Sequence, residues 1–188
     1  MPAPAFEELQ IRAAVPDEAT LDAFSRFVLD HAAESGREGS PHFSPTSQRS
    51  SRSEVRDNTR ARWLRDLDEP LWGRAWLVWS GGVVVGELEL RGGRVHAELH
   101  RATLGMGLRR SFTRQGHGRR LMEIALRWAR EEAHLSWIDL GVFSDNVPAR
   151  KLYQRMGFVE LGVRPDAFRI DGGVVVDDIL MVLDLREK

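Results

Sequence analysis

The sequence predicts an α/β fold in which helices cover both faces of one mixed β-sheet. Segments 74–80 and 83–90 flank the pair Gly81-Gly82, an arrangement typical of a β-hairpin with a glycine turn. The apolar residues of segment 121–128 recur at positions i, i+3, i+4 and i+7, which indicates a helix with one buried face. Strand and helix patterns follow one another along the chain, an order that favours a sheet between helices.

The first half of the chain predicts one strand, two helices and a long loop. Residues 9–15 alternate sufficiently between apolar and polar types for a strand, and Pro16 then opens a helix with one apolar face. Segment 34–53 is rich in Gly, Ser and Pro, so it predicts a mobile loop of the kind that often serves as a lid. Residues 54–67 predict a second helix with arginines on its outer face.

The second half contains the elements that carry the functional motifs. Residues 97–108 predict a strand that leads into a glycine-containing loop, and residues 136–143 predict the strand after the helix. No repeats and no second domain are visible, so the sheet is expected to be a single one.

The C-terminal part predicts a short helix and a hairpin. Asp145 or Asn146 caps the helix, which is expected to end at Met156 before a glycine. Segments 162–170 and 174–185 flank a turn of one aspartate and two glycines, so they predict an antiparallel hairpin.

Composition narrows the class of protein. A length of 188 residues fits one domain with one core, and a net charge of −1 argues against attraction to nucleic acid or to a membrane. The absence of cysteine excludes disulfides, thiolate catalysis and zinc–thiolate sites. No apolar run approaches the roughly 20 residues of a membrane span, and no signal pattern precedes the first element. A cytoplasmic protein is expected.

The segment from Thr113 to Leu121 has the features of a backbone anion site. It follows a strand, contains Gly116 and Gly118, and opens a helix. Glycines let the main chain approach a ligand closely, and the N–H groups of the first helical turn point at it. Neighbouring arginines add positive potential. The pattern predicts a bound phosphate or pyrophosphate.

Two familiar phosphate loops do not fit this segment. The nucleotide P-loop requires a Gly-Lys pair, which does not occur in the chain. The dinucleotide fingerprint requires a third glycine, and Leu121 stands at that position. The loop could also be an ordinary turn, so the next motif along the chain decides its interpretation.

The next motif lies between Leu140 and Phe158 and contains Asn146, Ala149, Leu152, Tyr153, Gly157 and Phe158. It is similar to the second half of the signature of the GNAT family of N-acetyltransferases. The signature reads Asn-x-x-Ala-x-x-Leu-Tyr-x-x-x-Gly-Phe, and the glycine loop resembles the family's pyrophosphate loop upstream of it. One position departs from the family pattern, because Thr113 stands where Gln or Arg is usual. The fixed positions of the downstream motif are all present.

The resemblance covers roughly residues 87–185, about half of the chain. It implies a GNAT-like acyl-CoA N-acyltransferase fold with a mostly antiparallel central sheet, in a single domain of residues 1–188, and acetyl-CoA as co-substrate without a metal. The glycine loop would hold the pyrophosphate, a valine at 118 would block it, and the backbone of Met106 and Leu108 would bind the pantetheine arm like an added strand. The expected cofactor-binding residues are Met106, Gly107, Leu108, Arg114, Gln115, Gly116, His117, Gly118, Arg119 and Asn146.

Tyr153 is the expected general acid. It is the only tyrosine in the chain, and its counterpart in the family donates a proton to the departing sulfur. A phenol is neutral at pH 7 and can therefore give up that proton. The alternative is a core aromatic residue whose hydroxyl has a structural partner.

The general base remains open among several candidates. Glu87 shares a strand face with Glu89, and Glu98 and His100 are expected to share a face of the next strand. Each of them could take a proton directly or through water. The pair His96 and His100 has a spacing that could suit a metal, but no third ligand stands out, so no metal site is expected.

The motifs and the family resemblance together predict an N-acetyltransferase, which moves an acetyl group from acetyl-CoA to the amine of a small molecule or peptide. Because no cysteine is present to carry the acyl group, we expect the amine to attack the thioester directly. A non-catalytic acyl-CoA-binding sensor or scaffold is the alternative, and an enzyme with a longer-chain acyl donor is a further one. A homodimer is possible. The sequence does not discriminate among acceptor amines.

Overall fold

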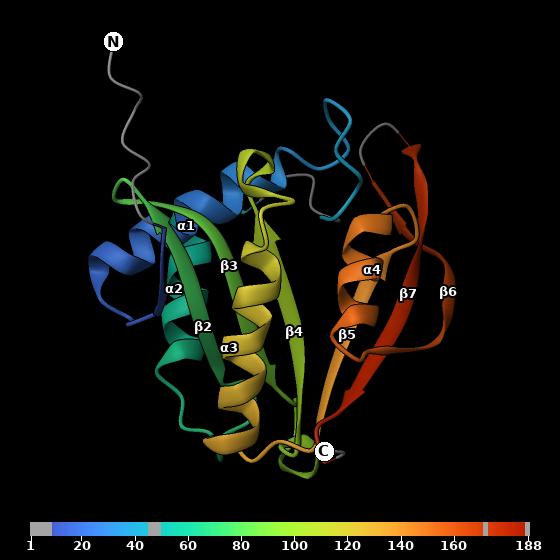
Figure 1. The fold of residues 1–188 in the computed structure, drawn as a ribbon. Coiled ribbons are helices and arrows are strands. Elements are labelled where there is room, and N and C mark those ends of the chain that lie inside the picture. Colours follow the sequence, from blue (N-terminus) through green and yellow to red (C-terminus); the bar gives the residue numbers. More distant parts are fainter. Residues whose placement is uncertain (1–8, 45–49, 171–172, 187–188) are drawn as a thin grey trace.

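A computed structural model describes residues 9–44, 50–170 and 173–186, and it confirms the mixed α/β fold class (Figure 1). The order of the main helices and strands is the predicted one, with two short 3-10 turns added. The elements are β1 (Gln10–Ala13), α1 (Glu18–Ala32), α2 (Arg52–Trp63), β2 (Gly73–Ser80), β3 (Val83–Gly92), η1 (His96–Glu98), β4 (Arg101–Leu108), η2 (Arg110–Phe112), α3 (His117–Glu131), β5 (Trp137–Phe143), α4 (Val147–Arg155), β6 (Val159–Arg169) and β7 (Val175–Asp184).

The sheet is mostly antiparallel and has one weak seam. Its strand order is β1-β2-β3-β4-β5-β7-β6, and only β4 and β5 run parallel. Those two strands pair over three positions, from Arg101 to Thr103 on β4 and from Trp137 to Asp139 on β5. Beyond Thr103 the strands separate, and Figure 1 shows the two halves of the sheet diverging towards the end where α3 begins. Within the described ranges, the separation leaves this edge of β4 without a strand partner beyond Thr103.

Helices cover both faces of the β1–β4 half of the sheet, because apolar side chains of these strands point to both faces. Alternate strand residues point to opposite faces. On one face Leu77 and Val84 pack with Phe24 and Phe27 of α1 and with Trp63 of α2. On the other face the strands pack against α3, and α4 joins the same core through Tyr153. Figure 1 shows α3 in front of the sheet and α1 and α2 behind it.

The second helix begins earlier than the sequence predicts and also ends earlier. Its first turn has a complete capping box, because Ser51 Oγ accepts from Glu54 N at 3.2 Å and Glu54 Oε2 accepts from Ser51 N at 2.7 Å. The helix therefore starts at Arg52, so the predicted loop 34–53 ends two residues sooner. Residues 45–49 of that loop lie outside the described residues.

The strand predicted over residues 97–108 is shorter than expected. Its first part is the turn η1, in which Leu99 N donates to His96 O, and the strand begins only at Arg101. The turn is closed by Glu98, whose carboxylate accepts from Arg94 N at 2.8 Å. Glu98 and His100 therefore do not share a strand face, and that prediction was wrong.

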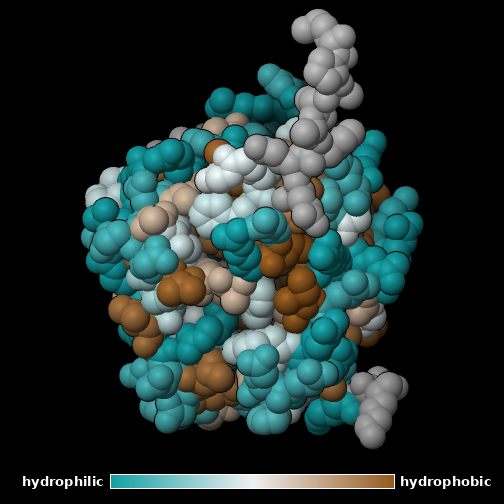
Figure 2. Space-filling view, turned by 60° about the vertical axis from the view of Figure 1, so that its left-hand side comes forward, coloured by the Kyte–Doolittle hydropathy of each residue, from teal (hydrophilic) through white to brown (hydrophobic). Residues whose placement is uncertain are grey.

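One face of the molecule is largely polar. Figure 2 shows a face on which hydrophilic side chains predominate and apolar ones are scattered among them. Across the described ranges, no helix combines the length and the apolar character needed to cross a membrane.

Candidate functional site

The loop between β4 and α3 has the backbone form of an anion site. Gly116 is the N-cap of α3 and has a φ of +85°, in the left-handed region that favours glycine. Arg114 also has a positive φ, of 59°. No side chain caps the helix, so its first N–H groups are left to other acceptors. The sharp bend and the uncapped helix start suit the phosphate-binding interpretation of this loop.

The side chains of this loop bond mainly to the loop itself. Gln115 Nε2 donates to Ser111 O at 2.8 Å, and His117 Nε2 lies 3.3 Å from Gln115 Oε1. Thr113 Oγ1 donates to Arg110 O at 2.8 Å. His117, the first residue of α3, thus turns its side chain back towards the loop. The polar Thr113 supports the turn in the position where the family pattern has a longer residue.

Gly118 faces the protein interior. A Cβ on this residue would meet Leu152 Cδ2 at 3.2 Å, Leu108 Cδ1 at 3.5 Å and Met106 Cε at 3.6 Å. A larger side chain would therefore press against β4 and α4 before it reached a ligand on the helix axis. The absence of a side chain at Gly118 therefore lets α3 pack closely against its neighbours. The sequence analysis had instead expected this glycine to make room for the ligand.

The unpaired edge of β4 includes Met106 and Leu108. Residues two apart on a strand present their backbone groups to the same side, so both can hydrogen-bond to an extended chain entering the seam between β4 and β5. Their side chains pack towards Gly118, which places the edge beside the glycine loop. Gly105 and Gly107 flank Met106 in the part of β4 that lies beyond its pairing with β5.

Glu87 lies beside this edge on the face of the sheet that α1 and α2 cover. It is directly opposite Gly107 of β4 in the antiparallel register. Its Oε2 atom is inaccessible to solvent and has no hydrogen-bond partner. Burial, and secondly the negative charge of Glu89, raise the pKa of the Glu87 carboxyl to about 8, although Arg91 and Arg62 oppose the shift. A buried carboxyl with a free oxygen next to an open strand edge is suited to proton transfer.

Glu89, two residues along the same face, has a different environment. Its carboxylate accepts from Trp63 Nε1 at 2.8 Å, from Arg91 Nε at 2.7 Å and from Arg62 Nε at 3.2 Å. It is almost fully buried and accepts hydrogen bonds from three side chains, so it fixes α2 to the sheet.

Tyr153 reaches the site from α4. It is buried in the core beside Phe158, with the two ring centroids 5.8 Å apart. Burial raises the pKa of the phenol above its usual value, and the charge of Glu87 raises it further. The two side chains are therefore close enough to interact electrostatically, although they come from opposite sides of the seam. The phenol is protonated across the neutral pH range.

Of the two residues predicted to cap α4, Asp145 and Asn146, Asn146 is the N-cap. Its Oδ1 accepts from Ala149 N at 3.3 Å, so the carbonyl oxygen is used within the helix. A role towards an acyl arm would therefore fall to its amide N–H groups.

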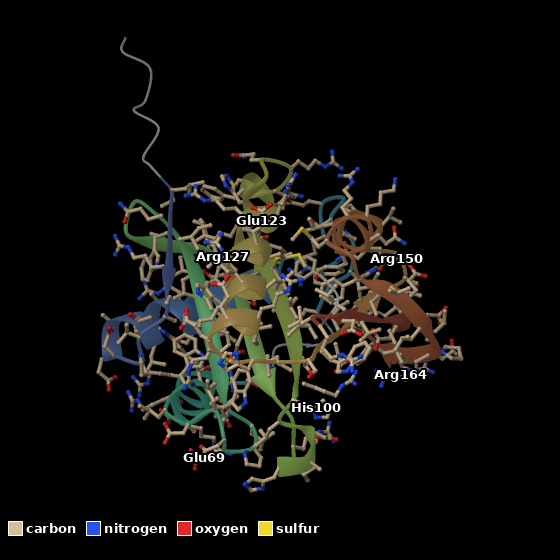
Figure 3. All side chains as sticks on the ribbon, turned by 60° about the horizontal axis from the view of Figure 1, so that its bottom comes forward. Glu69, His100, Glu123, Arg127, Arg150 and Arg164 are labelled. Carbon is tan, nitrogen blue, oxygen red and sulfur yellow. The ribbon has the colours of Figure 1, made fainter. Side chains whose placement is uncertain are left out.

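The other candidate bases lie elsewhere. Glu98 and His100 precede β4, whereas the glycine loop follows it. An eight-residue strand spans roughly 26 Å. Glu98 and His100 therefore lie at one end of β4, and the glycine loop lies at the other end. Figure 3 shows His100 at that remote end, away from Arg150 of α4. The structure places Glu87 opposite Gly107 and within electrostatic influence of Tyr153, and it leaves Glu98 and His100 at the far end of β4.

Two further residues near this edge, His31 and Glu34, were not marked by the sequence analysis. His31, in the last turn of α1, lies against the backbone of Gly107, and its Nδ1 is 3.4 Å from Glu34 Oε2. No local pattern in the sequence marks either residue, because their significance depends on contact with β4. Among the residues with described positions, no group of three or more His, Asp or Glu side chains could hold a metal ion.

Comparisons with known proteins agree with this geometry. The sequence profile of the acetyltransferase (GNAT) family matches residues 40–158, more than half of the chain. No match was found among curated proteins. Many solved structures have a similar fold.

Three of these structures illustrate the similarity. A GNAT-family acetyltransferase from Streptococcus pneumoniae is 23% identical with a TM-score of 0.74, over 94% of this chain and 99% of its own. YncA from Salmonella typhimurium, solved with its cofactor acetyl-CoA, is 19% identical with a TM-score of 0.77, over 96% and 95%. Spermidine N-acetyltransferase from Vibrio cholerae, solved with CoA and spermine, is 20% identical with a TM-score of 0.74, over 95% and 96%.

Proposed function

The chain belongs to the acetyltransferase (GNAT) family, and on that premise we propose that it transfers the acetyl group of acetyl-CoA to a primary amine by direct attack. The observation that carries the proposal is the carboxyl of Glu87, with its unpartnered Oε2, beside the open edge of β4. Solved structures of similar fold contain acetyl-CoA, or CoA with spermine, which supports the choice of both substrates.

The residues present fit the acyl donor. The uncapped start of α3 at Gly116 offers N–H groups to the pyrophosphate, with Arg114 and Arg119 nearby. Met106 and Leu108 offer backbone groups along the open edge to the pantetheine amides. Bound acetyl-CoA supplies the thioester, whose carbonyl carbon forms the new C–N bond as its C–S bond breaks.

Glu87 is the proposed general base. A cationic amine next to the carboxyl favours the ionised form of Glu87 and so lowers its raised pKa towards neutrality. A base whose pKa lies near the working pH is effective, because it is available and also strong enough to take the ammonium proton. The proton then moves from the amine nitrogen to the carboxylate oxygen.

Tyr153 is the proposed general acid on the other side of the seam. Its hydroxyl would donate a proton to the departing sulfur. The raised pKa keeps the phenol protonated, but it also makes complete transfer to a thiolate with a pKa of about 8.5 unfavourable. The benefit expected from Tyr153 is therefore modest.

The test compares two glutamates in one assay. Acetyl transfer is measured as thiol release from acetyl-CoA with a panel of primary amines that includes spermidine and phosphinothricin. Glu87→Gln should lower turnover by roughly 10²- to 10⁴-fold, the usual range for loss of a general base. Glu98→Gln is the matched control and should stay near the wild-type rate, since Glu98 closes a remote turn.

The non-catalytic acyl-CoA-binding module makes a different prediction in the same experiment. It would show heat of binding for acetyl-CoA and CoA in calorimetry without thiol release for any amine. Absence of both binding and turnover would contradict the proposal and the alternative together.

A further inference from the structure

His31 is directed at the strand position opposite Glu87. Its Nε2 and Cδ2 atoms lie 2.7 Å and 2.6 Å from the point where a Cβ of Gly107 would be. Glu87 and Gly107 are direct partners in the β3–β4 register, so their side-chain positions lie roughly 5 Å apart on the same face. Only glycine at 107 leaves room for the imidazole, which therefore sits beside Glu87 above the open edge of β4.

Three neighbours hold the imidazole in one orientation. The ring is stacked between Phe27 and Phe43, with centroid distances of 5.2 Å and 4.4 Å and interplanar angles of 12° and 13°. Glu34 sets the rotation of the ring, because its Oε2 lies 3.4 Å from Nδ1. The same oxygen accepts from Arg110 N at 3.2 Å, which ties Glu34 to the turn after β4. The side chain of His31 is only 14% exposed.

This environment determines which ring nitrogen carries the proton. A carboxylate next to Nδ1 favours the tautomer with hydrogen on Nδ1, which leaves a lone pair on Nε2. Burial lowers the pKa of His31 below 6.5, and the positive charge of Arg109 contributes in the same direction, whereas Glu34 opposes the shift. Asp30 pairs with Arg109 at 2.9 Å and reduces that contribution. At pH 7 His31 is neutral, with Nε2 as a hydrogen-bond acceptor.

We propose that His31 orients the acceptor amine: its Nε2 accepts one N–H of the substrate ammonium while Glu87 accepts another. This inference rests on the proposed function and adds to it a residue that selects and orients the amine. A primary ammonium has enough N–H donors to serve both acceptors and still expose its nitrogen to the acyl carbon after one proton has left. A tertiary amine has too few. His31 is accordingly a specificity-determining residue that favours amines with at least two N–H donors in the ammonium form, as primary amines have.

The same contact makes amine binding depend on pH. Protonated His31 has no lone pair on Nε2, and its charge repels an ammonium ion. The KM for the amine should therefore rise as the pH falls through the pKa of His31, which lies below 6.5. At pH values above that pKa, His31 should cause no further change in the KM. Glu87 titrates at a higher pH, so the two effects are separable.

The first test is independent of turnover. Nitrogen-15 NMR of the wild-type protein should show His31 as the Nδ1–H tautomer at pH 7. Addition of spermidine in the presence of CoA should shift the Nε2 resonance of His31. An Nε2–H tautomer, or a resonance that spermidine leaves unchanged while the amine binds elsewhere, would overturn the proposal.

The second test uses kinetics. His31→Phe keeps an aromatic ring between Phe27 and Phe43 but removes the acceptor nitrogen. The KM for spermidine or phosphinothricin should rise roughly 10- to 100-fold, the effect of losing a hydrogen bond to a charged group, with acetyl-CoA affinity unchanged. His31→Gln retains an acceptor oxygen, so it should recover part of the loss and remove the acid dependence of KM. His100→Phe is the matched control and should change neither quantity.

The outcomes separate the two proposals. Turnover with an unchanged amine KM in His31→Phe contradicts the role of His31 and leaves the acetyltransferase activity intact. Absence of turnover with every amine contradicts the proposed function, and the NMR experiment then still decides whether His31 binds the amine.

Discussion

His42 Nδ1 and Asp145 Oδ2 lie 2.6 Å apart, although 103 positions separate the two residues along the chain. The same oxygen accepts from the backbone N of His42 at 3.1 Å. At the other flank, Glu34 and Glu38 both contact Arg110. Residues 34–44, here called the strap, thus connect the turn after β4 with the turn before α4. Figure 1 shows the strap between β4 and α4 at the end where the strands diverge.

We predict that the strap controls access of the amine. Asp145→Ala removes the acceptor for both bonds from His42, so amide exchange over residues 34–44 should become faster. The KM for the amine should change more than the affinity for acetyl-CoA. The contact is partly exposed, so the loss of global stability should be only about 1 kcal/mol or less.

Glu160→Ala is a suitable control for the strap experiment, because it also removes a partly exposed ion pair, with Arg150 at 2.9 Å, but leaves the strap untouched. Equal exchange over residues 34–44 in wild type and Asp145→Ala would show that the His42 contact does not hold the strap. The mobility expected for this loop from its composition remains a prediction.

Glu87 should make the protein less stable as the pH rises. The group titrates near 4.5 in the unfolded chain and at about 8 in the folded protein, so the folded state binds more protons between these values. The free energy of unfolding should therefore fall from about pH 5 to pH 8, by on the order of 3 to 5 kcal/mol for a shift of this size.

Chemical denaturation at several pH values checks this prediction. Glu87→Gln cannot titrate, so its stability should match wild type near pH 4 and exceed it above pH 8. Glu123→Gln, which changes an exposed carboxylate, is the control and should follow the wild-type curve. Parallel curves for wild type and Glu87→Gln would mean that Glu87 titrates normally.

Tyr153→Phe keeps the ring in place and removes only the hydroxyl. The turnover number should fall by about 10²-fold, towards the lower end of the range for general acids, because proton transfer from this phenol is unfavourable. Acetyl-CoA affinity measured by calorimetry should stay near wild type. Phe158→Leu controls for packing against the Tyr153 ring. An unchanged turnover number, with chemistry limiting the rate, would assign protonation of the sulfur to water.

Gly118 should tolerate alanine but not valine. Alanine in a helix is more favourable than glycine by about 1 kcal/mol, which offsets a slightly tight contact with Leu152. The extra methyl groups of valine overpack the interface of α3 with Leu108 and Leu152, at a typical cost of 1–3 kcal/mol. Thermal unfolding should therefore show a lower Tm for Gly118→Val alone. Loss of acetyl-CoA binding at an unchanged Tm would instead support the ligand-clearance explanation.

The elements that depend on local chemistry were predictable from the sequence. Gly116 at the helix start, Asn146 as a cap and the glycine turn at residues 81–82 each act through their own backbone or nearest neighbours. The family motif then identified Tyr153. The second helix was misplaced by two residues at its start, because the Ser51–Glu54 capping box outweighs the loop-like composition around it.

The choice among the candidate bases needed the tertiary structure. Glu87, Glu98 and His100 all lie in segments with strand-like patterns, and sequence spacing does not tell which end of a strand meets the glycine loop. The separation of β4 from β5 after Thr103 favours Glu87 in our proposal, because it opens the edge of β4 near Glu87, whereas Glu98 lies in a turn at the other end.

By itself the sequence determined the order of the main elements, the glycine loop before α3 and the helix that carries Tyr153, since these follow from hydrophobic period and turn chemistry. Only the tertiary structure decided which side chains lie near the open edge of β4. His31 and Gly107 are 76 positions apart, and their contact arises because α1 packs on the face of the sheet where Gly107 has no side chain. Contacts of that kind depend on the packing of whole elements, and no local pattern in the chain records them.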